Sequence, residues 1–159
     1  MSITTPAGMQ VRLGKLPART DVRTLRLARY VDLAKLPPPP PDLDLAAAVP
    51  EWPMYGNDRI GDCTTAAAAH MIEAWTAPAQ GAPVELSERA VLAAFEKVRR
   101  VDPVTGAEGA VELDVLAYWR RHGIGGHRIA AFAHVPAWDH HLVRAAAFLF
   151  GGLYIRLQL

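Results

Sequence analysis

The one cysteine of the chain, Cys63, stands between a polar loop containing glycines and an alanine-rich segment. Residues 64–75 contain no Gly or Pro, so this segment predicts a helix. A thiol that opens a helix meets unpaired N–H groups and the positive end of the macrodipole, which favours the thiolate. Asp62 can cap this helix, although its charge would raise the pKa of the neighbouring thiol. The position also suits a small buried residue, because free cysteine is among the most buried types.

Composition limits the classes of protein to which the chain can belong. With 159 residues, 51% of them hydrophobic, one domain with a sizeable core is expected. The formal net charge of +1 gives no indication of nucleic-acid or anionic membrane binding, and a lone cysteine forms no intramolecular disulfide. No secretory leader is expected, and no apolar run approaches the roughly 20 residues of a membrane span. We therefore expect a cytoplasmic protein.

Residues 1–41 are predicted to form a basic N-terminal arm and a proline spacer. Seven Lys and Arg residues but only two Asp lie between residues 12 and 35, and residues 21–34 are compatible with a short helix. The prolines at 37–41 predict a stiff polyproline II segment. The arm would either resemble a prosegment, bind a partner, or pack along the domain formed by residues 42–159.

The remainder predicts three further helices and a terminal strand. One helix begins after Ser87 as N-cap, one spans 112–122 and ends at Gly123, and one spans 140–150 with Asp139 as cap. Residues 76–83 are expected to be a loop and 127–135 an extended segment. Residues 153–159 alternate apolar and polar side chains, which predicts a half-buried strand that needs neighbouring strands.

Residues 43–75 resemble the N-terminal part of the papain-like cysteine peptidases, in which a cysteine opens the central helix. Three motifs depart from the family: Asp44-Leu45 lies near the usual Asp-Trp, Gly61-Asp62-Cys63 replaces Gly-Ser-Cys, and Thr64-Thr65-Ala66 replaces Trp-Ala-Phe. Asn57, six positions before Cys63, occupies the place of the family's oxyanion glutamine. Later segments at 86–88 and 118–124 are also similar to the family. These departures point to a divergent bacterial or phage-like branch.

The resemblance implies an α+β papain-like fold, of which residues 42–159 would form the helical part and one strand. It implies a thiol protease or related hydrolase, in which Cys63 attacks an amide carbonyl of a peptide or protein substrate. Asn57 and the Cys63 N–H would stabilise the oxyanion. No cofactor and no metal are expected, and the family's catalytic histidine is expected beyond residue 159.

Two alternatives remain open. A truncated, inactive family member would act as a binding or assembly module, associating through its exposed edge strand with another copy or a complementing chain. A cell-wall amidase of the NlpC or CHAP type would use His127, which follows two glycines, as its base. His70 would lie roughly 10 Å along the helix axis from Cys63, so we expect it to be a packed helix residue.

Overall fold

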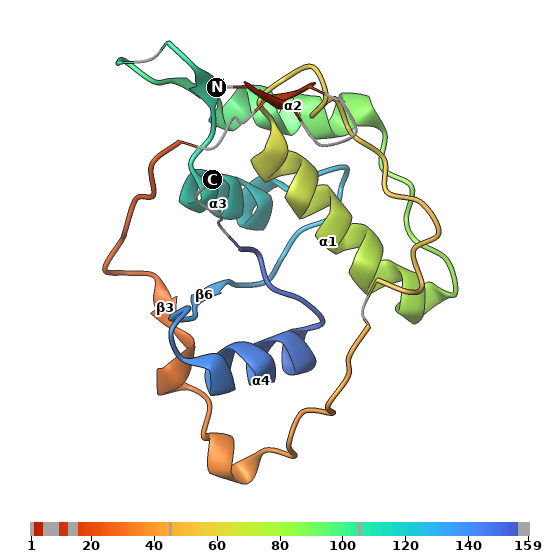
Figure 1. Ribbon diagram of the computed structural model, residues 1–159, viewed down its shortest axis with the longest axis vertical. Coiled ribbons are helices and arrows are strands. Elements are labelled where there is room, and N and C mark those ends of the chain that lie inside the picture. The colour runs from red at the N-terminus through yellow and green to blue at the C-terminus, as the bar shows by residue number, and fades with distance from the viewer. Residues whose placement is uncertain (1, 5–9, 13–15, 45, 105, 156–159) are drawn as a thin grey trace.

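Three helices form the larger of two parts of the molecule (Figure 1). The computed structural model describes residues 2–4, 10–12, 16–44, 46–104 and 106–155. Helix α1 (Cys63–Gln80) packs against α2 (Glu88–Val98) and α3 (Glu112–His122). Their shared core is built around Phe95 and Trp119, and the Trp119 ring stacks on Trp75 at 5.6 Å between centroids.

The predicted starts and ends of α2 and α3 are confirmed. The Ser87 hydroxyl accepts a hydrogen bond from the Ala90 N–H, and α3 ends at Gly123, whose φ of 87° suits glycine. On α3, Val115 and Trp119 are buried, whereas Ala117 is exposed. Val115 and Trp119 are four residues apart and therefore lie on the same, buried face of α3.

Helix α1 is longer than predicted, because residues 76–80 continue it where a loop was expected. Pro78 lies inside the helix, and the helix stops at Gly81, which has φ 80°. The Thr76 hydroxyl donates to the Ile72 carbonyl at 2.7 Å and accepts from the Val84 N–H at 2.9 Å. This pair of bonds secures the last turn, and Ala77 beneath it is buried.

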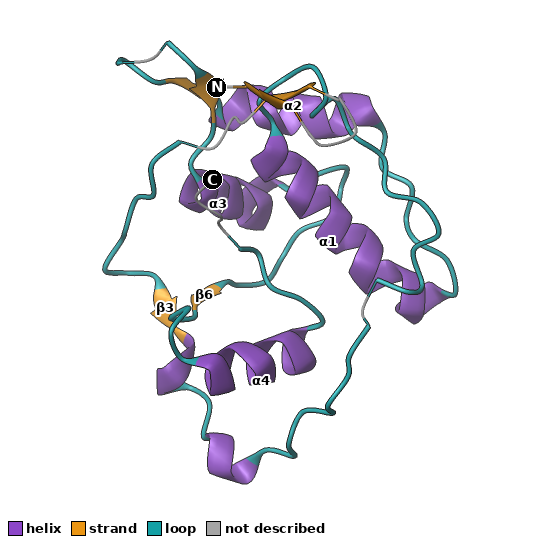
Figure 2. Ribbon diagram, in the orientation of Figure 1, coloured by secondary structure: helices purple, strands orange, loops and turns teal. Residues whose placement is uncertain are grey.

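The smaller part contains α4 (His140–Phe150) and the parallel strands β3 (Leu25–Arg26) and β6 (Ala133–His134) (Figure 2). Asp139 caps α4 by accepting from the Leu142 N–H at 3.0 Å, as predicted. Leu27, Leu142 and Ala146 form a separate buried cluster here.

The helix expected over residues 21–34 is wrong. Two 3₁₀ turns, Leu27–Arg29 and Leu33–Lys35, take its place after β3. The Asp32 side chain accepts from the Ala34 N–H and so begins the second turn, which interrupts any continuous helix.

Strands are few and short. Two antiparallel pairs join β1 (Ser2–Thr4) with β2 (Gln10–Arg12) and β4 (Arg100–Val101) with β5 (Glu108–Gly109). Of the extended segment expected at 127–135, only β6 is a strand. The terminal strand is absent from residues 153–155, and residues 156–159 lie outside the described part. Residues 153–155 have no strand beside them in the described part, and Tyr154 bonds to α1 instead. Overall the chain has an α+β composition.

Candidate functional site

Cys63 is the first residue of α1 and its side chain is half-buried. Asp62, at the N-cap, makes no side-chain capping bond. Its main-chain carbonyl instead accepts from the N–H groups of Thr65 at 2.9 Å and Ala66 at 3.0 Å, and from the Thr65 hydroxyl at 3.0 Å. The helix therefore begins as the sequence predicts, but without a carboxylate cap.

The Asp62 side chain is buried in the structure. None of its surface is exposed, and both carboxyl oxygens lack a hydrogen-bond partner. Burial is the largest cause that raises the pKa of Asp62 to about 7, and Glu88 and Asp58 add to it, while its own main-chain N–H and, more weakly, Arg59 act in the opposite direction. At neutral pH a large fraction of Asp62 is thus protonated, so its opposition to a thiolate at Cys63 is weaker than for an ordinary aspartate.

Asn57 lies in the tight loop that delivers the chain to Cys63. Tyr55 and Gly56 have positive φ angles of 53° and 93°, and the Asn57 N–H donates to the Met54 carbonyl at 2.9 Å. A Cβ on Gly56 would approach Leu92 at 3.1 Å, so both the φ angle and the space favour glycine there. Asn57 is half-buried, and its Oδ1 is enclosed without a partner.

Tyr154 reaches the first turn of α1 from the other end of the chain. Its hydroxyl donates to the Thr64 carbonyl at 2.7 Å. Burial is the largest cause that raises the pKa of Tyr154, followed by the Glu112 carboxylate and then Cys63. Tyr154 is therefore a neighbour of the thiol that the sequence did not indicate, and Glu112 lies close enough to Tyr154 to act on it. The alternating pattern of residues 153–159 placed Tyr154 on the polar face of a strand, which concealed this contact.

The structure defines contacts of His70 and His127. His70 Nε2 lies 2.8 Å from the Pro53 carbonyl, and its ring packs against Trp52 and Tyr55, which confirms that it is a packed helix residue. The main chain of His127 forms a short bridge with Ile124, with N···O distances of 2.9 and 3.0 Å.

The start of α1 thus holds a half-buried thiol and a buried carboxyl, and the Tyr154 phenol bonds to its first turn. Asn57 lies in the loop that precedes them. Within the described residues, no group of three or more His, Cys, Asp or Glu could hold a metal ion. No described helix has the length and apolar character that crossing a membrane requires. A scan against protein-family models gives no match, and neither the curated proteins nor the solved structures searched include a similar chain.

Proposed function

We propose that the chain is a papain-like cysteine hydrolase of amide bonds, with Cys63 as nucleophile. The observation that carries this proposal is the position of the half-buried Cys63 thiol as the first residue of an 18-residue helix. The first-turn N–H groups favour negative charge on sulfur, and the raised pKa of Asp62 reduces the charge that would oppose it.

The proposed reaction is acyl transfer. The thiolate adds to the amide carbonyl, and the Asn57 side chain with the Cys63 N–H stabilises the resulting oxyanion. Collapse breaks the C–N bond, the amine leaves with a proton, and a thioester on Cys63 remains. Water then releases the acid and restores the thiol. The imidazole that moves these protons in the family would come from polypeptide beyond residue 159 or from a complementing chain.

The test is acylation of the purified protein by p-nitrophenyl acetate, followed by intact-mass spectrometry. We expect one acetyl group on the wild-type protein and none on Cys63→Ala. Asn57→Ala should slow acylation by about 10²-fold, because one oxyanion donor is lost. A matched control is Asp42→Ala, which changes an exposed polar residue and should leave the rate unchanged. Acylation of Cys63 at the rate of a free cysteine peptide would contradict the proposal.

A second candidate function is that of an inactive papain-like binding module. It is favoured by apolar side chains that stay exposed near the end of the chain: Phe150 is 54% exposed and Ile155 is 66% exposed. Association would then occur at this surface with another copy. Sedimentation velocity of the wild-type protein and of Phe150→Ser separates the two functions. The binding module predicts that the wild-type protein sediments as an oligomer and Phe150→Ser as a monomer, whereas the hydrolase proposal requires no difference in oligomeric state.

A further inference from the structure

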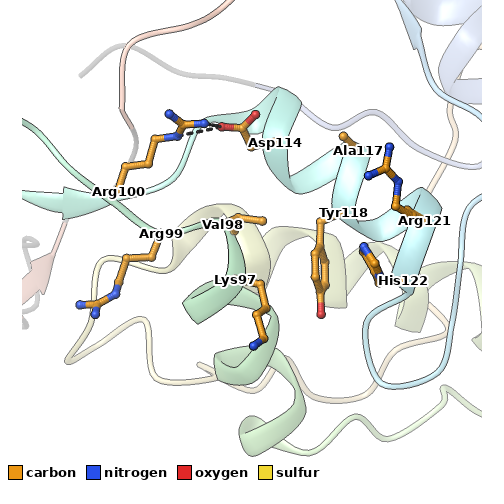
Figure 3. Close-up of a pocket in the computed structure, with 9 residues that line it drawn as sticks. All are labelled: Lys97, Val98, Arg99, Arg100, Asp114, Ala117, Tyr118, Arg121 and His122. Atoms are coloured by element: carbon orange, nitrogen blue, oxygen red, sulfur yellow. Dashed lines mark hydrogen bonds and ion pairs between the residues drawn. The ribbon is translucent and has the colours of Figure 1, made fainter.

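A depression of about 540 Å³ lies between the C-terminal end of α2 and the length of α3, from Asp114 to His122 (Figure 3). Helix α2 and the strand after it contribute one wall, and α3 contributes the other. The lining residues are Lys97, Val98, Arg99, Arg100, Asp114, Ala117, Tyr118, Arg121 and His122. Five of these nine side chains are Lys, Arg or His and one is acidic, so the lining is predominantly basic.

Ion pairs neutralise one side of this depression only. Arg99 pairs with Glu108 at 2.7 Å and with Glu96 at 3.2 Å. Arg100 pairs with Asp114 at 2.7 Å. Among the described residues, no carboxylate lies within 4.0 Å of the charged groups of Lys97, Arg121 or His122. Positive charge without an ion-pair partner among the described residues is therefore concentrated on the other side, toward the C-terminal end of α3.

Tyr118 adds a neutral donor to this side. Figure 3 shows its ring between Lys97 and His122, with the Tyr118 hydroxyl and the Lys97 ammonium pointing the same way. The rings of Tyr118 and His122 lie 4.9 Å apart with an angle of 33° between their planes. His122 thus lies against the Tyr118 ring, and no hydrogen bond joins the Tyr118 hydroxyl to another residue in the described part of the chain. An ammonium, a phenol O–H and an imidazole line one small surface.

Basic residues at helix C-termini also complement the macrodipole, and this would explain Lys97 on α2 and Arg121 on α3 separately. It does not explain why unpaired basic side chains of two helices line one hollow together with a tyrosine hydroxyl. We propose that this depression binds a small phosphate-bearing anion. A lysine ammonium is a compact charge that suits phosphate, and the hydroxyl and imidazole provide further donors to its oxygens.

The test is a calorimetric titration with inorganic pyrophosphate at pH 7 and physiological salt. Saturable binding by the wild-type protein is expected. Lys97→Met, which keeps most of the apolar stem, should weaken binding about tenfold, equivalent to roughly 1.4 kcal/mol. Tyr118→Phe should weaken it by a few-fold through loss of one hydrogen bond. The matched control is Arg120→Met, which removes a charge from the same end of α3 but does not line the depression.

Three results would overturn this inference. The first is an absence of saturable binding to the wild-type protein at pyrophosphate concentrations up to about 10 mM. Weaker binding than this would be no different from non-specific association. The second is an equal loss of affinity in Arg120→Met and Lys97→Met, which would show a response to net charge alone. The third is equally tight binding of citrate, which would exclude a preference for phosphate. Circular dichroism of each variant verifies that it is folded.

Discussion

The Tyr154 hydroxyl donates a hydrogen bond to the Thr64 carbonyl, which joins the segment after α4 to the first turn of α1. Figure 1 shows this segment rising from α4 toward α1 and α3. The contact links the smaller part of the molecule to the residue that follows the proposed nucleophile. Its loss should therefore be measurable both in stability and at Cys63.

Tyr154→Phe removes this hydrogen bond and keeps the ring. We expect the free energy of unfolding to fall by about 1 kcal/mol, with the Thr64 carbonyl left without this donor. Urea denaturation followed by circular dichroism measures the change. Tyr30→Phe is the control, because Tyr30 is exposed and its loss of a hydroxyl should have no effect. Equal stability of the two variants would contradict the role of the Tyr154 contact.

Asp62 predicts an unusual dependence of stability on pH. Its pKa is about 7 in the folded chain and near 3.9 when unfolded, so the folded state binds more protons between these values. The contribution of Asp62 to stability thus falls as pH rises from about 4 to 7. Asp62→Asn should stabilise the protein by about 1–3 kcal/mol at pH 8 and by almost nothing at pH 4.

Thermal unfolding of Asp62→Asn at these two pH values tests this difference. Asp42→Asn is the control: it removes a charge from an exposed side chain, so its effect on stability should be the same at pH 4 and at pH 8. A stabilisation that is the same at pH 4 and pH 8 would mean that the charge on Asp62 is not its source.

The indole of Trp119 fills the centre of the three-helix core, with 1% of its surface exposed. Trp119→Ala should lower the free energy of unfolding by about 3–5 kcal/mol, because a large cavity replaces the ring that stacks on Trp75. Trp138, which is 79% exposed, provides the control, and Trp138→Ala should change stability by less than about 0.5 kcal/mol. Guanidinium titrations monitored by circular dichroism compare the two.

The histidine requirement is tested by alkylating Cys63 with iodoacetamide over a range of pH. We expect His127→Ala and His70→Ala to leave the pH profile of the wild-type protein unchanged, since the His70 ring contacts the Pro53 carbonyl and the main chain of His127 pairs with Ile124. The apparent pKa should lie below about 8.5 in all three proteins through the effect of the helix N-terminus. A profile that shifts upward only in His127→Ala would favour the amidase alternative.

Local signals in the sequence were enough to locate α2, α3 and α4. Ser87, Gly123 and Asp139 act on neighbouring main-chain groups, so their roles follow from a few adjacent residues. The end of α1 was missed because Pro78 is a general signal against helix, whereas the Thr76 hydroxyl bonds that hold the last turn depend on the chain's return at Val84.

Contacts between distant residues could not be read in the same way. The sequence placed Asn57 and Cys63 at one junction, because only a short loop separates them. The position of Tyr154 beside Thr64, and the pairing of β3 with β6, depend on how the helices pack. The burial of Asp62 was also missed, since a residue before a helix ordinarily reads as a solvated cap.

The parallel pairing of Leu25 with Ala133 has a consequence for synthesis of the chain. Leu25 leaves the ribosome long before its partner strand and before α4, against which Leu27 is buried. The helices α1, α2 and α3 are neighbours in sequence, so they can assemble while translation continues. During that interval Leu27 and the nearby apolar side chains stay uncovered. The early segment would then depend on its positive charge, or on a chaperone, to avoid premature association.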